Sequence, residues 1–369
     1  GKLRLNGGYS KYVGRLAETV QGAGSAAGDP WGIYYYYDGA PIVGTADQVV
    51  RQVVDWFNSQ GGMDYANWQG AYDPSLSIGG FSTRLAGGLV APSVDEWTIG
   101  AGWQITPNSF VRANYVDRVW NDYYGQFTNT TTGSVVEPIT GAEADLTLFD
   151  NTDLLEREYQ GIDVTARTRF LSRFQAGANY TWSELKGNAE GEGTAGGPFA
   201  GGGWLLQYPE YQGYIQNRPY GVLSGDQTHK LRAWVGADWS LGRAGTLNVS
   251  VLERYDTGLS YSISGSILAR RDPATGTDSL GYISVPTTTT YFFSDRGSER
   301  WDDLTSTDLA LNYEIPIGRA SIFAQGEVIN VLDEQAQIAG NTAIITRTSS
   351  SQACRDSAGA PMRCLAFNP

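Results

Sequence analysis

The stretch HKLRAWVGADWSL, from His229 to Leu241, alternates apolar with polar residues along its whole length. One set of alternate positions is apolar and comprises Leu231, Ala233, Val235, Ala237, Trp239 and Leu241. The other set comprises Lys230, Arg232, Trp234, Gly236, Asp238 and Ser240. Successive side chains of a β-strand point to opposite faces, so a period of two predicts a strand. Strands of soluble proteins usually run for about five or six residues, which makes the length of this one unusual.

Eight other stretches repeat the alternation, so the sequence predicts nine long strands in all. Among them, EWTIGAGWQI and RFQAGANYTWS keep apolar residues on one face and Gly, Asn, Gln or charged residues on the other. The eight stretches are residues 2–9, 96–105, 109–116, 161–170, 173–183, 245–255, 307–317 and 320–332.

The connections between these strands fall into two length classes. Four are tight, near Pro107, Ser172, Gly242–Gly245 and Gly318. An outer-membrane barrel has short periplasmic turns, long extracellular loops, and strands that alternate apolar-out with polar-in. A soluble β-sandwich gives no physical reason for short turns to gather at one end of the sheet and long loops at the other. The long class, which we assign to extracellular loops, covers about 14–93, 129–156, 187–228, 264–301 and 336–369.

Composition agrees with a transmembrane antiparallel β-barrel, the all-β fold that we predict. Charged residues make up only 18 % of the chain, against roughly 25 % in typical soluble proteins. We expect Trp239 to face lipid near the periplasmic rim and Trp234 to point into the lumen. A large soluble β-structure, with a partner sheet over the apolar faces, is the alternative. Aromatic residues that suit interfacial girdles near the strand ends are Trp97, Trp103, Phe110, Tyr180, Trp182 and Trp239.

The chain-wide balance of charge and hydropathy excludes several classes of protein. The net charge of −13 argues against nucleic acid as a partner, because phosphate binding needs a basic surface. No apolar run approaches the 18 residues or more of a transmembrane helix. The chain opens inside a strand pattern and ends at CLAFNP, so we interpret it as a piece of a longer polypeptide.

The two cysteines, Cys354 and Cys364, bracket the segment RDSAGAPMR. Their spacing can close a small loop as a disulfide, which indicates an oxidising compartment. Two free thiols are the alternative.

In the first long loop, Thr45 and Gln48 stand at capping-box spacing before Val49, Val53 and Phe57, which predicts a short helix ending near Gly61.

Little in the sequence points to catalysis, and we expect no enzymatic activity and no catalytic residue. His229 is the one histidine, and its place at a strand start beside Asp226 favours a positioning role over a catalytic triad. HExxH, CxxC and P-loop patterns are absent. We therefore expect no cofactor, except that one acidic cluster has the oxygen-ligand density that structural calcium takes. Arg296 and Arg300 are interleaved with this cluster and could neutralise it; its acidic members are Asp295, Glu299, Asp302 and Asp303.

Three segments resemble the late barrel strands of TonB-dependent outer-membrane receptors. DQTHKLRAWVGADWSLGRAGTLNVSVLERYDTGLSYS carries a D-x-x-H opening, here Asp226 to His229. DLALNYEIPIGRASIFAQGEVINVLDEQ resembles the penultimate hairpin, whose pattern ends at Asn330–Asp333. VDEWTIGAGWQITPNSFVRANYVDR is also similar. Within this family, the three segments are most similar to Oar-like receptors, which carry an N-terminal carboxypeptidase-regulatory-like domain.

This resemblance implies a 22-stranded barrel with an N-terminal plug and a TonB box. The nine strands would be strands 13 to 21, the C-terminal part of one barrel domain, with the plug and the last strand absent from this chain. The implied partners are outer-membrane lipid of a Gram-negative bacterium, the TonB complex through the plug, and a small extracellular solute.

The implied function is energised import of a scarce solute, with siderophore, oligosaccharide and peptide classes all compatible. A passive porin-like or structural barrel is the alternative, followed by a secreted soluble β-protein. Amphipathic aromatics dominate recognition surfaces, so we expect loop aromatics to contact the ligand. These ligand-binding candidates are Tyr34, Tyr35, Tyr36, Trp56, Trp204, Tyr208 and Tyr211.

Overall fold

The computed structural model describes most of the chain and all nine predicted strands. The described residues are 2–14, 37–62, 82–136, 141, 143–190, 207–209, 219–268, 281–283 and 288–344.

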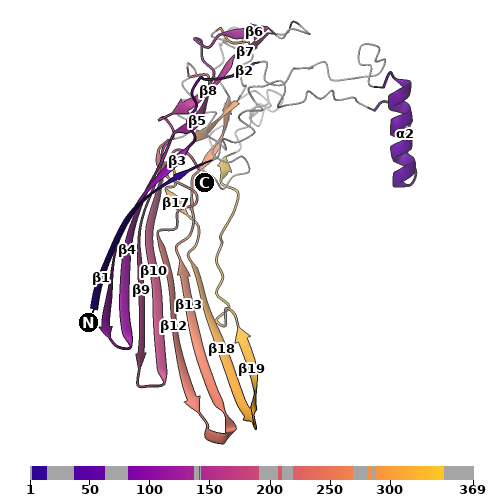
Figure 1. Cartoon of the computed structure of the whole chain (residues 1–369). Coiled ribbons are helices and arrows are strands. Elements are labelled where there is room, and N and C mark those ends of the chain that lie inside the picture. Colours follow the sequence, from indigo (N-terminus) through magenta and orange to yellow (C-terminus); the bar gives the residue numbers. More distant parts are fainter. Residues whose placement is uncertain are drawn as a thin grey trace, which may run out of the picture.

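One antiparallel sheet contains the nine long strands, and each pairs with the next long strand along the chain (Figure 1). The two-residue strand β11 (Gly221–Val222) adds to the end of one of them. The strand prediction is therefore confirmed, and the fold is all-β. In sheet order the strands are β1 (Lys2–Val13), β3 (Ser93–Thr106), β4 (Ser109–Asn121), β9 (Arg157–Phe170), β10 (Phe174–Gly187), β12 (His229–Ser240), β13 (Thr246–Asp256), β18 (Leu304–Ile317) and β19 (Ala320–Val328).

Tight turns join alternate strand pairs at one end of the sheet, the lower end in Figure 1, which we call the turn end. Three residues, Leu171 to Arg173, link β9 to β10, and the first two have positive φ, of 48° and 51°. Three-residue loops with a residue in the left-handed region are a common hairpin connection. The β12–β13 turn contains a 3₁₀ segment, Gly242–Ala244, and Gly245 follows it at φ 113°. The four tight turns of the sequence pattern thus lie together, and the strand ends from which the long connections leave lie at the opposite end, which we call the loop end.

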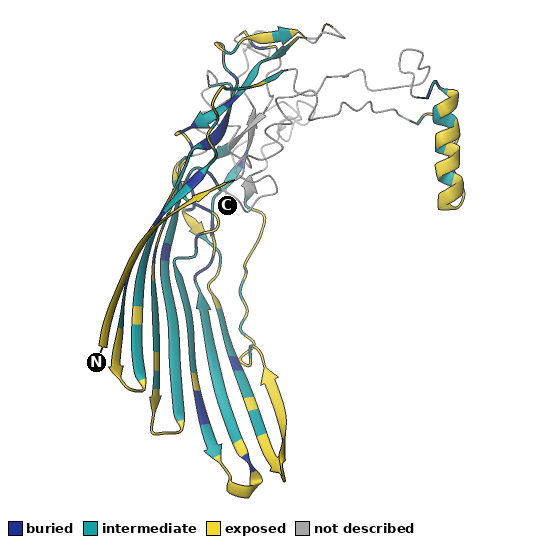
Figure 2. Ribbon diagram, viewed as in Figure 1, coloured by how far each residue is buried: buried dark blue, intermediate teal, exposed yellow. Residues whose placement is uncertain are grey.

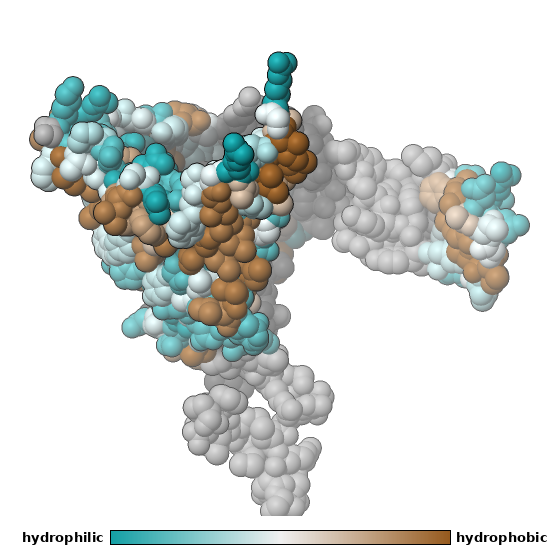
Figure 3. All heavy atoms as spheres, turned by 90° about the horizontal axis from the view of Figure 1, so that it is seen from below, coloured by the Kyte–Doolittle hydropathy of each residue, from teal (hydrophilic) through white to brown (hydrophobic). Residues whose placement is uncertain are grey.

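The two faces of the sheet differ in chemistry because the strands stay in register. Leu5 pairs with Ala101 and Ile99 with Tyr115, whereas Asn6 pairs with Gly100, which pairs with Asn114. We call the first face the apolar face and the second the polar face. Large residues on the apolar face remain open to the surroundings: Leu5, Trp97 and Ile99 are 76 %, 60 % and 64 % exposed. Viewed from the turn end, hydrophobic side chains form continuous patches on the surface (Figure 3).

The sheet has no apolar core of its own within the described residues. Of their buried hydrophobic side chains, Ala237 alone belongs to a long strand. The rest lie at the loop end, where Tyr124 and Phe149 form one cluster with Leu85 and Leu89. A sheet whose apolar face is uncovered needs another apolar phase to stabilise it.

Both outer strands of the sheet are exposed throughout, β1 and β19 alike (Figure 2). Among the described residues, each pairs with one neighbouring long strand, β3 and β18 respectively. Their outer hydrogen-bonding edges are therefore free to pair with further strands, as expected if the sheet is one part of a larger β-barrel wall.

The loop end contains short strands that build small sheets above the wall. Strands β2, β8 and β5 make one three-stranded sheet, and β16, β15 and β20 make another. Their bounds, with the remaining short strands, are β2 (Thr83–Leu85), β5 (Tyr123–Phe127), β6 (Ser134–Val136), β7 (Glu143–Asp145), β8 (Thr147–Thr152), β14 (Ser260–Tyr261), β15 (Ser264–Leu268), β16 (Thr288–Phe292), β17 (Glu299–Arg300) and β20 (Ala343–Ile344).

The predicted helix in the first long connection is confirmed as α2 (Ala46–Ser59). At its start, the Thr45 backbone N–H donates to Gln48 Oε1 at 3.0 Å, as the capping-box spacing predicted. Gly62, at φ 59°, follows its last turn and donates to the carbonyl of Phe57. Among the described residues, no helix combines the length and the hydrophobicity needed to cross a membrane.

Phe110 corrects one detail of the predicted girdle. It pairs with Gln104 on β3 and with Arg167 on β9, so it lies on the polar face and not among the lipid-facing aromatics. The reason is the alternation of side chains along the strand. β4 places Val111, Ala113 and Tyr115 on the apolar face, and Phe110, one residue before Val111, points to the opposite face. Trp239 lies on the apolar face opposite Leu247, and Trp234 lies on the polar face, as expected.

Candidate functional site

The polar face is the surface of the sheet on which hydrogen-bonding and charged side chains concentrate. Its central rows run across the strands, for example from Gly102 to Arg112, Thr165, Asn179 and Arg232. Asn179 Nδ2 donates to Asp163 Oδ2 at 3.1 Å and to Thr165 Oγ1 at 3.0 Å. Cross-strand contacts of this kind fix polar side chains on a surface that remains open to water.

Ion pairs link neighbouring strands on the loop-end half of the polar face. Arg232 makes a bidentate pair with Asp256, at 2.9 Å and 2.7 Å. One strand further on, Arg254 Nη2 lies 2.7 Å from Asp308 Oδ2, whose side chain is only 4 % exposed. The bidentate Arg232–Asp256 contact has fixed geometry and holds the register of β12 and β13, and the Arg254–Asp308 contact links β13 to β18.

Trp234 covers a glycine on the polar face. A Cβ built on Gly177 would lie 2.8 Å from the indole of Trp234, so only glycine leaves room for the ring. The two residues are directly paired across β10 and β12. The inward aromatic of the sequence pattern is therefore a packing element of the wall.

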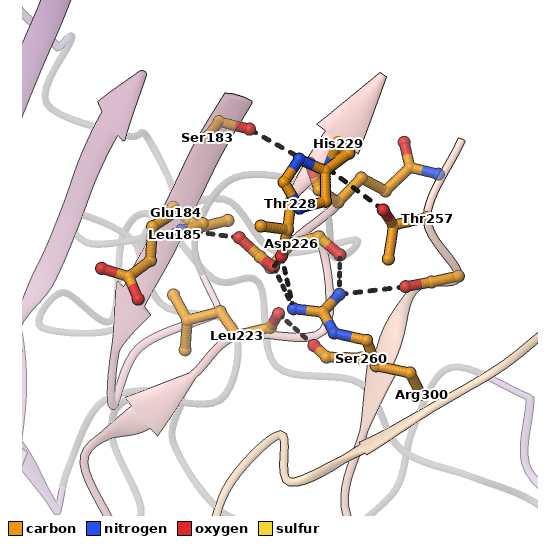
Figure 4. Close-up of polar contacts among 12 residues, drawn as sticks. Ser183, Glu184, Leu185, Leu223, Asp226, Thr228, His229, Thr257, Ser260 and Arg300 are labelled. Carbon is orange, nitrogen blue, oxygen red and sulfur yellow. Dashed lines mark hydrogen bonds and ion pairs between the residues drawn. The ribbon is translucent and has the colours of Figure 1, made fainter. Parts of the chain in front are cut away.

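A buried cluster joins the loops to the strand ends, with Asp226 at its centre (Figure 4). The Asp226 side chain is 1 % exposed and pairs with Arg300 Nη2 at 2.6 Å. Asp226 Oδ1 also accepts the backbone N–H of Leu185 at 2.8 Å, and Oδ2 accepts Thr228 Oγ1 at 3.0 Å. Arg300 in turn donates to the carbonyl of Gly258 at 3.0 Å. One carboxylate thus ties β10, the β11–β12 connection and β17 together.

A second buried cation, Arg296, lies in the same layer. Its side chain is 4 % exposed and pairs with Glu190, which also accepts Ser224 Oγ at 2.8 Å. Burial by itself raises the pKa of Glu190, but the Arg296 guanidinium and the Ser224 hydrogen bonds outweigh it, so the pKa is lowered. Glu190 is therefore held ionised at neutral pH.

His229 takes part in positioning contacts at the start of β12. Its Nδ1 lies 2.8 Å from the Tyr180 hydroxyl, and the two rings stack with centroids 6.1 Å apart. Its backbone N–H donates to Thr257 Oγ1 at 3.2 Å. Asp226, its neighbour in sequence, is committed to Arg300.

The structure describes two of the seven predicted ligand-binding aromatics. Trp56 lies on α2, where its Nε1 donates to Asp38 Oδ1 at 3.2 Å and its ring contacts Tyr37. Tyr208 is partly buried against Tyr282, with ring centroids 4.9 Å apart, and burial raises the pKa of its hydroxyl. The remaining candidates lie outside the described residues: Tyr34, Tyr35, Tyr36, Trp204 and Tyr211.

The acidic candidates for a metal site hold separate backbone and hydroxyl contacts. Asp302 Oδ2 accepts the N–H of Gln337, and Asp303 accepts the N–H of Gly258 and the hydroxyl of Tyr255. These two contacts hold the pKa of Asp303 below its usual range. Within the described residues, no group of three or more His, Cys, Asp or Glu side chains could hold a metal ion. Asp295 and Glu299 each contact Ser298, through the Asp295 carbonyl and the Glu299 carboxylate.

Sequence reasoning missed the partners of the two loop arginines. Arg296 and Arg300 do not neutralise the acids beside them in sequence; they pair with Glu190 and Asp226, which are 106 and 74 residues away. The D-x-x-H opening singled out Asp226, but nothing in the pattern named its partner. Cys354 and Cys364 lie outside the described residues, so the disulfide stays a prediction.

Comparison with known proteins gives distant structural similarity alone. No known protein family matches the chain, and no curated protein does. Among solved structures, the crystal structure of the outer membrane transporter YddB from Escherichia coli is similar, at 12 % sequence identity and a TM-score of 0.43. The similarity covers 91 % of this chain and 35 % of the transporter, so the chain spans about a third of its length. A likeness this distant assigns neither a family nor a function.

Proposed function

We propose that this chain forms part of the wall of an outer-membrane β-barrel, and that the whole protein is a TonB-dependent, Oar-like receptor that imports a scarce solute. The uncovered apolar face of the nine-stranded sheet is the observation that carries the barrel proposal. Lipid would cover that face, and the polar face would line a hydrated lumen.

Strand length supports a membrane-spanning role. A tilted strand crosses the hydrocarbon region with about 9–11 residues. The long strands have 9 to 14 residues, so each is long enough to span it. The placement of Trp97, Trp103 and Trp239 toward the two ends of the apolar face suits the interfacial girdles of such barrels.

The polar chemistry of the side chains on the polar face supports transport over a purely structural role. Charged and amide side chains line it, and the loop layer above it contains buried ion pairs that fix the strand connections. The dependence on TonB rests on the sequence resemblance of three hairpins. We propose that the loop aromatics, including Trp56 and Tyr208, contact the incoming solute.

Uptake measurements on the bacterium that carries the gene test this function. Cells with and without the gene are supplied with labelled siderophores, oligosaccharides and peptides. We expect accumulation of one class to disappear on deletion, and to disappear equally when a protonophore removes the energy that TonB transmits. Uptake that needs the gene but survives the protonophore would identify a passive porin.

A matched pair of loop variants tests the solute contacts. Replacement of the seven candidate aromatics by alanine should abolish accumulation of that solute, whereas replacement of Leu171 and Ser172 at the opposite end should not. Unchanged uptake by the aromatic variant, at normal abundance in the outer membrane, would exclude these residues from recognition.

A further inference from the structure

Charges are distributed unevenly between the two halves of the polar face. In the loop-end half, each of three carboxylates has a guanidinium partner: Glu96 with Arg118, Asp256 with Arg232 and Asp308 with Arg254. The two members of each pair neutralise one another locally.

Four cations in the turn-end half have no such partner: Lys2, Arg4, Arg112 and Arg167. All four are exposed, and within the described residues none forms an ion pair. The single side-chain contact among them is that of Arg112 Nε with Asn114 Oδ1, at 3.1 Å. We call these residues the cationic patch.

The strand register brings the members of the cationic patch together. Gly102 lies between Arg4 on β1 and Arg112 on β4, and pairs with both. A Cβ on Gly102 would meet no atom within 4 Å, so the surface between the two guanidinium groups is open. Lys2 lies one row nearer the turn end, opposite Gln104.

Arg167 completes the patch from the next strand. It pairs with Phe110, and Arg112 pairs with Thr165, which makes Arg112 and Arg167 diagonal neighbours. Diagonal neighbours on antiparallel strands stand about 7–8 Å apart at their backbones, within reach of long side chains. Two guanidinium groups at this spacing can bind the same multivalent anion.

The acidic residue diagonal to Arg112 does not pair with the patch. Asp163 stands diagonally from Arg112 but forms no ion pair with it within the described residues; its Oδ2 instead accepts hydrogen bonds from Asn179 Nδ2 at 3.1 Å and from Thr181 Oγ1 at 3.0 Å. The chain as a whole carries a net charge of −13, so an uncompensated group of cations on one part of one face is contrary to the overall balance. Their charge is left available for a ligand.

We propose that the cationic patch binds small multivalent anions carrying phosphate or carboxylate groups, and that the solute of the proposed transporter belongs to this class. The inference rests on the proposed function for the location of the polar face in a lumen. Arginine presents a planar fork of donors that matches both groups in a bidentate manner, and three of the four cations are arginines. The turn end would be the exit side of the lumen, so the patch would hold the anion after it has left the loops.

Binding to the full-length protein in lipid nanodiscs tests the proposal, with pyrophosphate and citrate as probes and the neutral sugar maltotriose as control. We expect calorimetric binding of both anions, no binding of maltotriose, and weaker anion binding as salt rises. The double variant Arg112→Gln/Arg167→Gln should bind at least tenfold more weakly, because each lost charge-assisted contact is worth roughly a factor of ten. Arg319→Gln, which removes an exposed arginine in the β18–β19 turn, should bind like the parent.

Three results would overturn the proposal. Neither anion binds; or both bind equally to the parent and to the double variant; or an added acidic polypeptide, poly-glutamate, binds at the patch while the small anions do not. In each case heat-dependent gel mobility of the same sample shows whether the barrel is folded. A folded barrel that still imports a solute without an anion site leaves the proposed function intact and removes only this inference.

Discussion

At the scale of single residues, the Asp226–Arg300 pair joins β17 to the β11–β12 connection and to the end of β10. The Asp226 carboxylate is almost completely buried, and the Arg300 side chain is 30 % exposed. Removal of one partner of a buried pair leaves an uncompensated charge and costs about 3–5 kcal/mol. Because Arg300 is partly hydrated, we expect Arg300→Gln to cost about 3 kcal/mol, at the lower end of that range.

Hydrogen exchange at the backbone amides of Leu185 and Asp226 measures this loss, since both amides belong to the cluster. The double variant Asp226→Asn/Arg300→Gln should recover part of the protection, because it leaves no buried charge. Arg243→Gln, in the β12–β13 turn, is the matched control and should change nothing. Equal protection in the parent and in Arg300→Gln would show that the pair does not anchor the loops.

The pKa shifts of two loop carboxyls define an acid limit for the loop layer. The pKa values of Glu190 and Asp303 are lowered in the folded protein. Their stabilising contribution is therefore complete above the unfolded pKa values, about 4.3 for Glu and 3.9 for Asp, and is lost as the pH falls through the folded values. We expect loop protection, corrected for intrinsic exchange, to be constant from pH 8 to 5 and to fall below about pH 4. Loss already between pH 7 and 5 would contradict this assignment.

The sequence predicted the face on which single strand residues lie, but not the long-range partners of single loop residues. Parity along a strand was enough to place Trp234 and Trp239 correctly on opposite faces. It could not identify the partners of Arg296 and Arg300, because those contacts join segments 106 and 74 residues apart. Periodicity carries information about faces, whereas long-range pairing in loops depends on three-dimensional packing.

At the scale of elements, the strand alternation specifies which substitutions the sheet tolerates. Val251 lies on the apolar face between Val235 and Leu309, and Ser250 lies next to it on the polar face between Gly236 and Ala310. If lipid covers the apolar face, Val251→Arg should destabilise the folded barrel by about 2–4 kcal/mol, the cost of Arg near the bilayer midplane. Ser250→Arg should cost less than about 1 kcal/mol, because its side chain stays in water.

Urea unfolding in lipid vesicles, followed by tryptophan fluorescence, measures the two free energies of unfolding. The pair isolates the environment of each face, since the added side chain is the same and the positions are adjacent. Similar costs for both variants would mean that the two faces meet the same solvent, and would favour a soluble protein with a covered sheet.

The elements were the most predictable part of the fold. Nine strands, four tight turns and the helix after Thr45 all follow from local patterns. Phe110 is the exception to the predicted placement of aromatics, because its position in the alternation along β4 determines its face, and its hydrophobicity does not. The short strands of the loop layer, such as β5 and β8, carry no alternation long enough to be recognised in sequence, although their side chains supply the buried core.

At the scale of the whole molecule, stability is divided between two regions with different physical bases. The loop layer holds the buried hydrophobic clusters and the buried Asp226–Arg300 and Glu190–Arg296 pairs, whereas the sheet leaves its apolar face uncovered. Burial of apolar surface contributes about 25 cal/mol per Å², so a sheet with this face in water forgoes its main source of stabilisation. The sheet therefore depends on an external apolar phase, and the loop layer does not.

This division predicts how the full-length protein behaves on extraction. The protein should remain in the outer-membrane fraction after washes with high salt and alkaline carbonate, and should need detergent to become soluble. In dodecyl sulfate without heating, it should run as a compact species on a gel and shift to its unfolded position after boiling. Val251→Arg should lower the temperature of that shift and Ser250→Arg should leave it unchanged, which links the gel assay to the apolar face itself. Recovery of a monodisperse protein without detergent would require a protein partner over the apolar face, and would exclude the membrane assignment.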